Sequence, residues 1–227
     1  FQKLIVDRKF LAAFYTTPPS AALLMGLALS SKAMPTGDGW GDRDKIESLR
    51  IADFACGTGT LLSAAYHRIA QLHELSGGDA KKLHTKMMSQ VLVGCDILPS
   101  ATHLTASMLS SFYPSVRYEK SLVMTVPYGI QKDGTIALGS LDLLKAQATF
   151  DLLSIHAKAA GGTGELQTNT WSDLPHSCFD LVAMNPPFTR ATGHEAGKVG
   201  VPVPMFAAFG KEDEEQRAMS KQLNRLT

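Results

Sequence analysis

The sequence has little cysteine and no excess of charge of either sign. Its 227 residues include three cysteines, Cys56, Cys95 and Cys178, which are widely spaced and form no CxxC pair. This pattern excludes a disulfide framework and a cysteine-rich zinc site, and it is typical of the reducing cytoplasm. Lys and Arg number 22 against 21 Asp and Glu, a net charge of +1, whereas a protein that binds nucleic acid alone is usually more basic. A polyanionic substrate would therefore be contacted mainly by something outside this chain.

Long apolar runs and metal-ligand patterns are also missing. No apolar run reaches the roughly 18 residues that cross a bilayer, and no signal peptide is visible, so we expect a cytoplasmic protein without membrane contact. The seven histidines show no metal-ligand spacing. No metal site is predicted, and the helical histidines His67, His73 and His84 are expected on solvated faces. The chain begins with Phe1 rather than methionine, which indicates a segment of a longer protein.

Short apolar segments alternate with helical ones along the chain. The predicted helices cover Ser20 to Ala33, the second half of Leu49 to Leu72, Asp79 to about Gln90, and Pro99 to Phe112. The predicted strands open Leu49 to Leu72 and cover Val91 to Ile97, Ser121 to Val126, Thr135 to Leu138, and Phe179 to Met184. Near-continuous apolar strands between helices predict a doubly wound, Rossmann-like α/β fold with a mostly parallel sheet. In such a fold the ligand lies beyond the carboxyl ends of the strands.

A glycine turn follows the first predicted strand in DFACGTGT, Asp53 to Thr60. Gly57 and Gly59 permit positive φ and close approach of a ligand, but the third glycine of a dinucleotide fingerprint is missing. Asp53 could accept a hydrogen bond from an ammonium group. Asp96, at the end of the next strand, is placed to accept both hydroxyls of a ribose. Together these features favour an adenosine that carries an amino-acid tail. The alternatives are a turn that only packs, and an Asp96 that caps the following helix.

The stretch FDLVAMNPPFTR, Phe179 to Arg190, interrupts an apolar strand with Pro186 and Pro187. Proline fixes φ and lacks a backbone donor, so neither strand nor helix continues through this corner. The Asn185 carboxamide oxygen and the Pro186 carbonyl are thereby preset as two acceptors for a planar NH2 group. Phe188 offers a face on which a heteroaromatic ring can stack. The corner predicts a site for a planar amine beside an activated methyl; the alternative is a rigid stop with Phe188 filling the core.

Four motifs occur in a characteristic order: FYTTPPSA from Phe14 to Ala21, then DFACGTGTLL, GCDILPSA and NPPF. In these motifs, and over nearly the whole chain, the sequence resembles the adenine-N6 DNA methyltransferases, particularly those of restriction-modification systems whose cofactor motifs precede the catalytic one. Methyltransferases of glutamine and of guanine amino groups use similar corners, and the upstream TPP segment separates the chain from them. One departure concerns the Asp or Asn that the family usually has near the cofactor adenine. In ALGSLDLL, Ala137 to Leu144, the chain offers Ser140 for this contact, or Asp142 two residues later. Either Ser140 or Asp142 is therefore expected to contact the adenine.

The resemblance implies an S-adenosylmethionine-dependent methyltransferase fold and assigns its cofactor contacts. Thr17 and Pro18 would line the methionine pocket. The loop after the first strand would grip the amino and carboxylate groups through Asp53, Ala55 and Gly57. Asp96 would hold the ribose, with Ile97 against the adenine. The full set of implied cofactor-binding residues is Tyr15, Thr16, Thr17, Pro18, Asp53, Ala55, Cys56, Gly57, Thr58, Gly59, Asp96, Ile97, Ser140 and Leu141.

The resemblance also implies the reaction and the partners. Asn185, Pro186, Pro187 and Phe188 form the catalytic tetrapeptide. They would receive a target adenine flipped out of double-stranded DNA, which costs a few kcal/mol, and no covalent enzyme intermediate is required. A specificity subunit or a C-terminal target-recognition domain would read the DNA, and a restriction subunit would be a further partner.

Residues 1–34 are interpreted as a helical segment with the upstream motif, and 35–227 as a catalytic domain that lacks its later strands. Because target recognition would lie elsewhere, we expect this chain alone to methylate DNA poorly. Alternatives are a methyltransferase of protein glutamine or RNA amino groups, and a cofactor-binding scaffold without catalysis. The intact Asn185 with both prolines argues against the scaffold.

Overall fold

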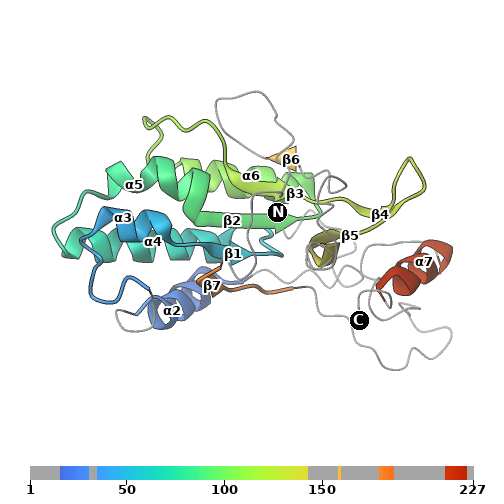
Figure 1. The fold of residues 1–227 in the computed structure, drawn as a ribbon, viewed down its shortest axis with the longest axis horizontal. Coiled ribbons are helices and arrows are strands. Elements are labelled where there is room, and N and C mark those ends of the chain that lie inside the picture. Colours follow the sequence, from blue (N-terminus) through green and yellow to red (C-terminus); the bar gives the residue numbers. More distant parts are fainter. Residues whose placement is uncertain (1–15, 31–34, 143–157, 160–178, 187–212, 224–227) are drawn as a thin grey trace.

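The computed structural model describes residues 16–30, 35–142, 158–159, 179–186 and 213–223. Its helices are α2 (Pro18–Ala28), α3 (Arg43–Ser48), α4 (Thr60–Leu75), α5 (Ala80–Lys86), the π-helical turn η2 (Met87–Val91), α6 (Pro99–Ser110) and α7 (Asp213–Leu223). Its strands are β1 (Ile51–Asp53), β2 (Leu92–Asp96), β3 (Leu122–Thr125), β4 (Tyr128–Ile130), β5 (Ile136–Leu138), β6 (Lys158–Ala159) and β7 (Leu181–Val182). Figure 1 shows their arrangement.

A parallel sheet with helices packed on it forms the centre of the molecule. Strands β3, β2, β1 and β7 lie side by side in that order and are all parallel, while β6 pairs antiparallel with β3 at one edge. The register pairs Asp53 with Gly94 and Ile51 with Leu181. The predicted α/β fold with a mostly parallel sheet is therefore confirmed for the described residues.

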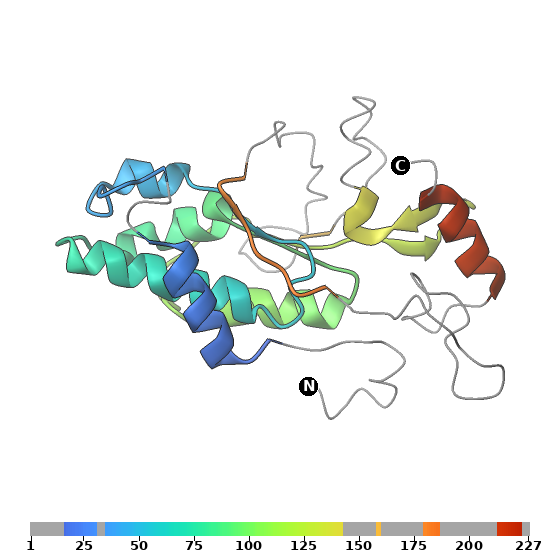
Figure 2. The same ribbon diagram turned by 90° about the horizontal axis from the view of Figure 1, so that it is seen from below.

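The central strands are apolar on both faces, as a covered parallel sheet requires. Ile51 and Leu92 belong to one buried cluster, while their neighbours Ala52 and Val93 belong to another. Since successive side chains of a strand point to opposite faces, the two clusters lie on the two sides of the sheet. Helix α2 packs along α4, and both can be followed beside the sheet in Figure 2.

The order of the strands reverses next to β1. The chain runs outward from β1 to β2 and β3, and a later segment returns as β7 on the other side of β1. At such a reversal the connections leave the sheet in opposite directions, which opens a crevice at the carboxyl ends of the two strands. Asp53 ends β1, and Asn185 follows β7 by three residues. The fold thus brings the glycine loop after β1 and Asn185 to one crevice.

Several predicted boundaries need correction. Helix α2 ends at Ala28 rather than Ala33, and the helix expected to reach Gln90 ends at Lys86 and continues as the π-helical turn. The strand predicted at Thr135 to Leu138 does not join the parallel sheet. It pairs antiparallel with β4 in a separate two-stranded sheet.

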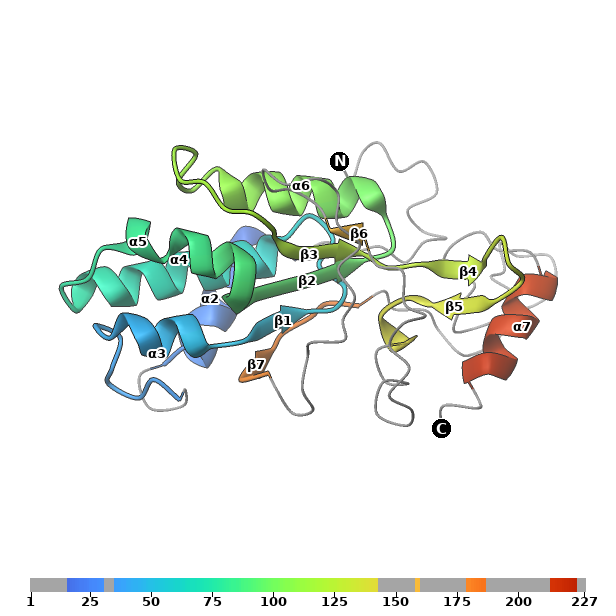
Figure 3. The same cartoon turned by 45° about the horizontal axis from the view of Figure 1, so that its top comes forward.

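The two-stranded sheet and α7 form a small lobe beyond the carboxyl ends of β2 and β3 (Figure 3). Met219 of α7 is fully buried and packs with Leu138, Tyr128 and Ile136 of the hairpin. The lobe lies at the same end of the sheet as the crevice between β1 and β7.

Two of the three helical histidines are buried, so the prediction of solvated faces is wrong for them. His73 is 4% exposed and its Nδ1 lies 2.7 Å from the Trp40 carbonyl oxygen. His84 is completely buried, and its Nδ1 lies 2.8 Å from the Tyr66 hydroxyl. Hydrogen bonding to buried partners offsets the cost of removing these rings from water, whereas His67 remains exposed as predicted.

None of the helices in the described parts of the chain combines the length and the apolar character that a membrane span requires.

Candidate functional site

The loop after β1 is tight and depends on its glycines. Asp53 Oδ1 accepts a hydrogen bond from the backbone N–H of Ala55 at 3.0 Å. Gly57 and Gly59 have φ values of 52° and 80°, in the left-handed region that favours glycine. A Cβ on Gly59 would lie 2.6 Å from the side chain of Thr105. Backbone conformation and packing therefore both require glycine at position 59.

Asp96 bridges this loop and the start of α6. One of its carboxylate oxygens accepts the N–H of Gly57 at 2.9 Å, and the other accepts the N–H of Leu98 at 2.9 Å. The sequence left open whether Asp96 contacts a ligand or caps the following helix. The N-cap of α6 is Leu98, so Asp96 is not the cap residue. A carboxylate offers about four lone-pair sites, so the Asp96 carboxylate keeps capacity for a further donor such as a hydroxyl.

The two carboxylates give the loop an unusual electrostatic character. Asp53 is 2% exposed, and burial raises its pKa to about 7; the hydrogen bond from Ala55 acts in the opposite direction, and the charge of Asp96 raises it further. Burial also raises the pKa of Asp96. Neither carboxylate has an ion-pair partner among the described residues. A cation next to Asp53 would stabilise the ionised form and lower its pKa.

Asn185 reaches the same crevice from the other side. The backbone N–H of Ala183 donates to the Ala52 carbonyl at 3.0 Å, which continues the β1–β7 pairing toward the corner. The Asn185 Nδ2 then donates to the Thr16 hydroxyl at 3.2 Å. Pro186 is exposed. The remaining residues of the tetrapeptide, Pro187 and Phe188, lie outside the described residues.

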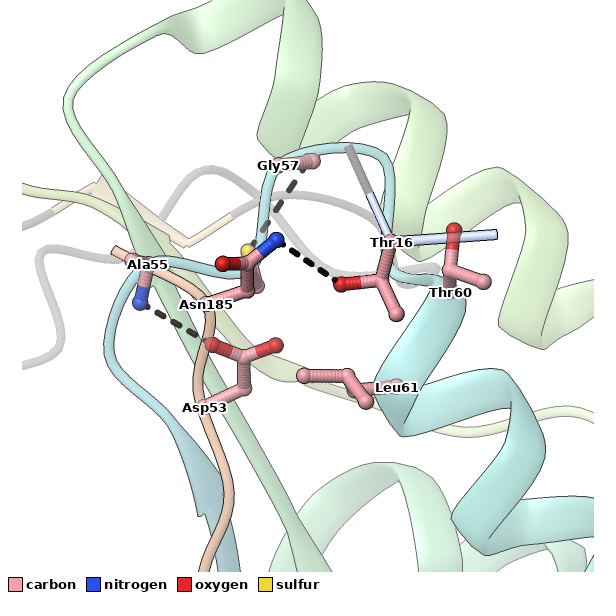
Figure 4. Close-up of a pocket in the computed structure, with 8 residues that line it drawn as sticks. Thr16, Asp53, Ala55, Gly57, Thr60, Leu61 and Asn185 are labelled. Atoms are coloured by element: carbon pink, nitrogen blue, oxygen red, sulfur yellow. Dashed lines mark hydrogen bonds between the residues drawn. The ribbon is translucent and has the colours of Figure 1, made fainter. Parts of the chain in front are cut away.

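A small pocket collects these groups (Figure 4). Its lining comes from the segment before α2, the loop after β1, the first turn of α4 and the corner after β7: Thr16, Asp53, Ala55, Cys56, Gly57, Thr60, Leu61 and Asn185. Its volume is about 250 Å³, part of which is open to solvent. Because much of this space is open solvent, the enclosed part can hold only one end of a nucleoside-sized ligand. We call it the Asp53 pocket.

Six of the residues predicted from the sequence line the Asp53 pocket, and two lining residues were not predicted. Thr60 and Leu61 begin α4 directly after the glycine turn. The position of the helix start was the available signal, because the first turn of a helix after such a loop faces the ligand. Thr17 and Pro18, expected to line the methionine pocket, are exposed; the Thr17 hydroxyl lies 2.8 Å from that of Ser20.

The residues predicted to meet an adenine lie near the turn after β5. Asp142 is 5% exposed, and its Oδ2 accepts the N–H of Leu138 at 2.7 Å. The Ser140 hydroxyl donates to the Phe54 carbonyl, which ties this turn to the loop after β1. A Cβ on Gly139 would lie 3.0 Å from Ile97 Cγ2. The carboxylate of Asp142 thus supports its own hairpin, while Ser140 bonds the loop that carries the pocket and Ile97 lies against the turn after β5.

The other predicted cofactor residues that the structure describes do not line the Asp53 pocket. Thr58 is half-buried in the glycine loop, and Leu141 is 40% exposed. Tyr15 lies outside the described residues.

The described cysteines are structural rather than nucleophilic. Cys56 and Cys95 are buried, and burial raises the pKa of both thiols well above the usual value. They stay protonated at neutral pH, although Cys56 touches the pocket, so neither is suited to attack an electrophile. No three His, Cys, Asp or Glu side chains gather as a metal-binding group in the described parts of the chain.

A comparison with protein-family models and a search of curated proteins found no match for this chain.

Proposed function

We propose that this chain is the cofactor-binding and catalytic part of a DNA methyltransferase that transfers a methyl group from S-adenosylmethionine to the N6 of a flipped adenine. The observation that carries the proposal is the convergence of Thr16, Asp53 and Asn185 on one pocket. They come from three motifs that are far apart in the sequence, in the order that the adenine-N6 methyltransferases share.

The residues of the Asp53 pocket fit the methionine end of the cofactor. S-adenosylmethionine carries an ammonium group, and a buried Asp53 without an ion pair in the described parts of the chain is suited to be its counter-ion. Backbone N–H groups of the glycine loop and of the first turn of α4 are suited to the carboxylate. The carboxylate of Asp96, which keeps capacity for a further hydrogen bond, is suited to the ribose hydroxyls.

The chemistry is divided between the cofactor and the corner after β7. When bound, the cofactor supplies a methyl group activated by its sulfonium. Asn185 Oδ1 and the Pro186 carbonyl accept the two N–H bonds of the target amine and so orient its lone pair. The amine needs no general base before attack, because the methylated nitrogen can release its proton to water. The protonated thiol of Cys56 agrees with a reaction without a covalent enzyme intermediate.

The DNA is read by a partner of this chain. With 22 Lys and Arg against 21 Asp and Glu, the chain has almost no excess positive charge for phosphate contacts, which supports a separate specificity subunit or a target-recognition domain, as in restriction-modification systems. A restriction subunit would join the same assembly.

The proposal is tested by methyl transfer from radiolabelled S-adenosylmethionine by the chain together with its DNA-recognition partner. We expect label in adenine-containing duplex DNA and a loss of at least about a hundredfold in Asn185→Ala, since two aligned acceptors become one. Lys82→Ala, on the exposed face of α5, should retain full activity. Transfer to protein glutamine or to RNA instead of DNA would replace this function by the corresponding alternative. Cofactor binding without any transfer would indicate the scaffold.

A further inference from the structure

We propose that Thr16 is a positioning residue that couples occupancy of the cofactor pocket to the orientation of the catalytic carboxamide of Asn185. This inference rests on the proposed function. Its starting point is one contact: Asn185 Nδ2 donates to Thr16 Oγ1 at 3.2 Å, and both residues line the Asp53 pocket. Figure 4 shows Asn185 Nδ2 directed at the Thr16 hydroxyl, with the carboxamide oxygen on the opposite side.

The orientation of this carboxamide decides whether the corner can work. Rotation by half a turn exchanges Oδ1 and Nδ2 without changing the shape of the side chain. In the observed orientation the group opposite Thr16 is an acceptor, as an N–H of the target amine requires. In the reversed orientation it is an NH2 group, which cannot accept a hydrogen bond from another amine.

A hydroxyl alone does not choose between the two orientations, because it can accept from Nδ2 or donate to Oδ1. At this contact, the preference between the two orientations depends on where the hydroxyl proton goes. Thr16 shares the pocket with the segments suited to the methionine end of the cofactor, which carries a carboxylate. When an anionic acceptor takes the Thr16 proton, the hydroxyl oxygen is left as an acceptor only, and Asn185 must present Nδ2 to it.

Cofactor binding therefore favours the productive orientation of Asn185 before the target base arrives. One hydrogen bond of this kind changes an equilibrium by roughly threefold to tenfold. The coupling is reciprocal, so DNA with a target adenine should tighten cofactor binding by the same factor. Thr16 thus acts through Asn185 and does not itself touch the target base.

The test measures binding rather than turnover. In the chain with its DNA-recognition partner, the Kd for a duplex containing the target adenine is measured with and without S-adenosylhomocysteine, a non-reactive ligand with the same amino-acid end. We expect the ligand to tighten DNA binding roughly threefold to tenfold in the wild type. Thr16→Val should remove this effect, and Thr16→Ser, which keeps the hydroxyl, should retain it. Thr85→Val is the matched control, since it removes a threonine hydroxyl that bonds the Arg117 carbonyl on the exposed side of α5.

Equal coupling in the wild type and in Thr16→Val would overturn the inference, and so would loss of coupling in Thr16→Ser. A folding defect is recognised by the melting temperature, and the serine variant then decides the question. Failure of the proposed function looks different: the wild type would not bind S-adenosylhomocysteine or would not methylate adenine. If the wild type binds S-adenosylhomocysteine and methylates adenine but shows no coupling, only the proposed role of Thr16 is rejected, and the proposed function stands.

Discussion

Replacing Asp53 by asparagine should stabilise the empty protein and weaken cofactor binding at the same time. The pKa of Asp53 is raised from 3.8 to about 7, chiefly by burial. A carboxyl with a raised pKa keeps its proton in the folded state where the unfolded chain has lost it. Stability therefore falls as the pH rises from about 4 to about 7, and the full penalty is present above pH 7. Asparagine does not ionise and keeps a side-chain oxygen for the N–H of Ala55.

The size of the effect follows from the shift. A rise of about three pKa units at about 1.4 kcal/mol per unit corresponds to a penalty on the order of 4 kcal/mol for ionised Asp53 at pH 8. Urea unfolding should therefore give Asp53→Asn a higher free energy of unfolding than the wild type at pH 8, and nearly the same value at pH 4. The control Glu119→Gln removes an exposed carboxylate and should change little at either pH.

Cofactor binding should change in the opposite direction. A charged hydrogen bond between Asp53 and an ammonium group is lost in the asparagine variant, so calorimetry at pH 8 should show a roughly tenfold or greater rise in the Kd for S-adenosylmethionine. In the wild type the affinity should fall as the pH drops below 7, because Asp53 then takes up a proton. A variant that is less stable than the wild type at pH 8, or that binds the cofactor equally well, would refute the reasoning.

Two further predictions concern the glycine loop and the buried histidine. Gly59→Ala should lower stability by more than Gly77→Ala, measured by thermal unfolding; both positions have positive φ, about 80° and 84°, but only at Gly59 would a Cβ meet another side chain, that of Thr105. An equal effect would show that backbone conformation alone requires the glycine. Burial lowers the pKa of His84 from 6.5, so its contribution to stability is lost as the pH falls below about 6.5. His84→Gln should reduce the fall in the free energy of unfolding between pH 7 and pH 5, and an unchanged slope would contradict this assignment.

The central fold was predictable because its strands carry a strong local signal. The segments of β1, β2 and β3 are short apolar runs followed by turns or helix starts, and a covered parallel sheet is the arrangement that buries both of their faces. Asp53 and Asp96 could be placed at the carboxyl ends of strands for the same reason. The glycine turn was recognisable because the turn requires positive φ, and glycine is the residue that adopts it most readily.

What the sequence did not predict depends on contacts between distant segments. Strand β4 was not predicted, because Gly129 interrupts its alternation of apolar and polar side chains. Its apolar residue Tyr128 packs against Met219, which lies far along the chain. His84 counts as polar in a helical pattern, but the Tyr66 hydroxyl gives it a buried hydrogen-bonding partner. The end of α2 was predicted too late. Leu23 and Leu27 are apolar although they are exposed, so the segment shows no regular alternation of apolar and polar faces from which the extent of the helix could be read.

The roles of Asp142 and Thr16 also required three-dimensional information. Ser140 and Asp142 are equivalent candidates in the sequence, whereas the structure directs the Asp142 carboxylate to the N–H of Leu138. Thr16 belongs to a motif associated with the cofactor, and only the fold brings its hydroxyl to Asn185, 169 positions later.

The most direct test of the central claim is the chemical identity of the product. Duplex DNA is incubated with S-adenosylmethionine carrying an isotopically labelled methyl group, the chain and its DNA-recognition partner, and is then digested to nucleosides for mass spectrometry. The account predicts label in N6-methyladenine, reduced at least about a hundredfold when Asn185→Ala replaces the wild type. Label in another nucleoside, or in protein or RNA with none in the DNA, would contradict it.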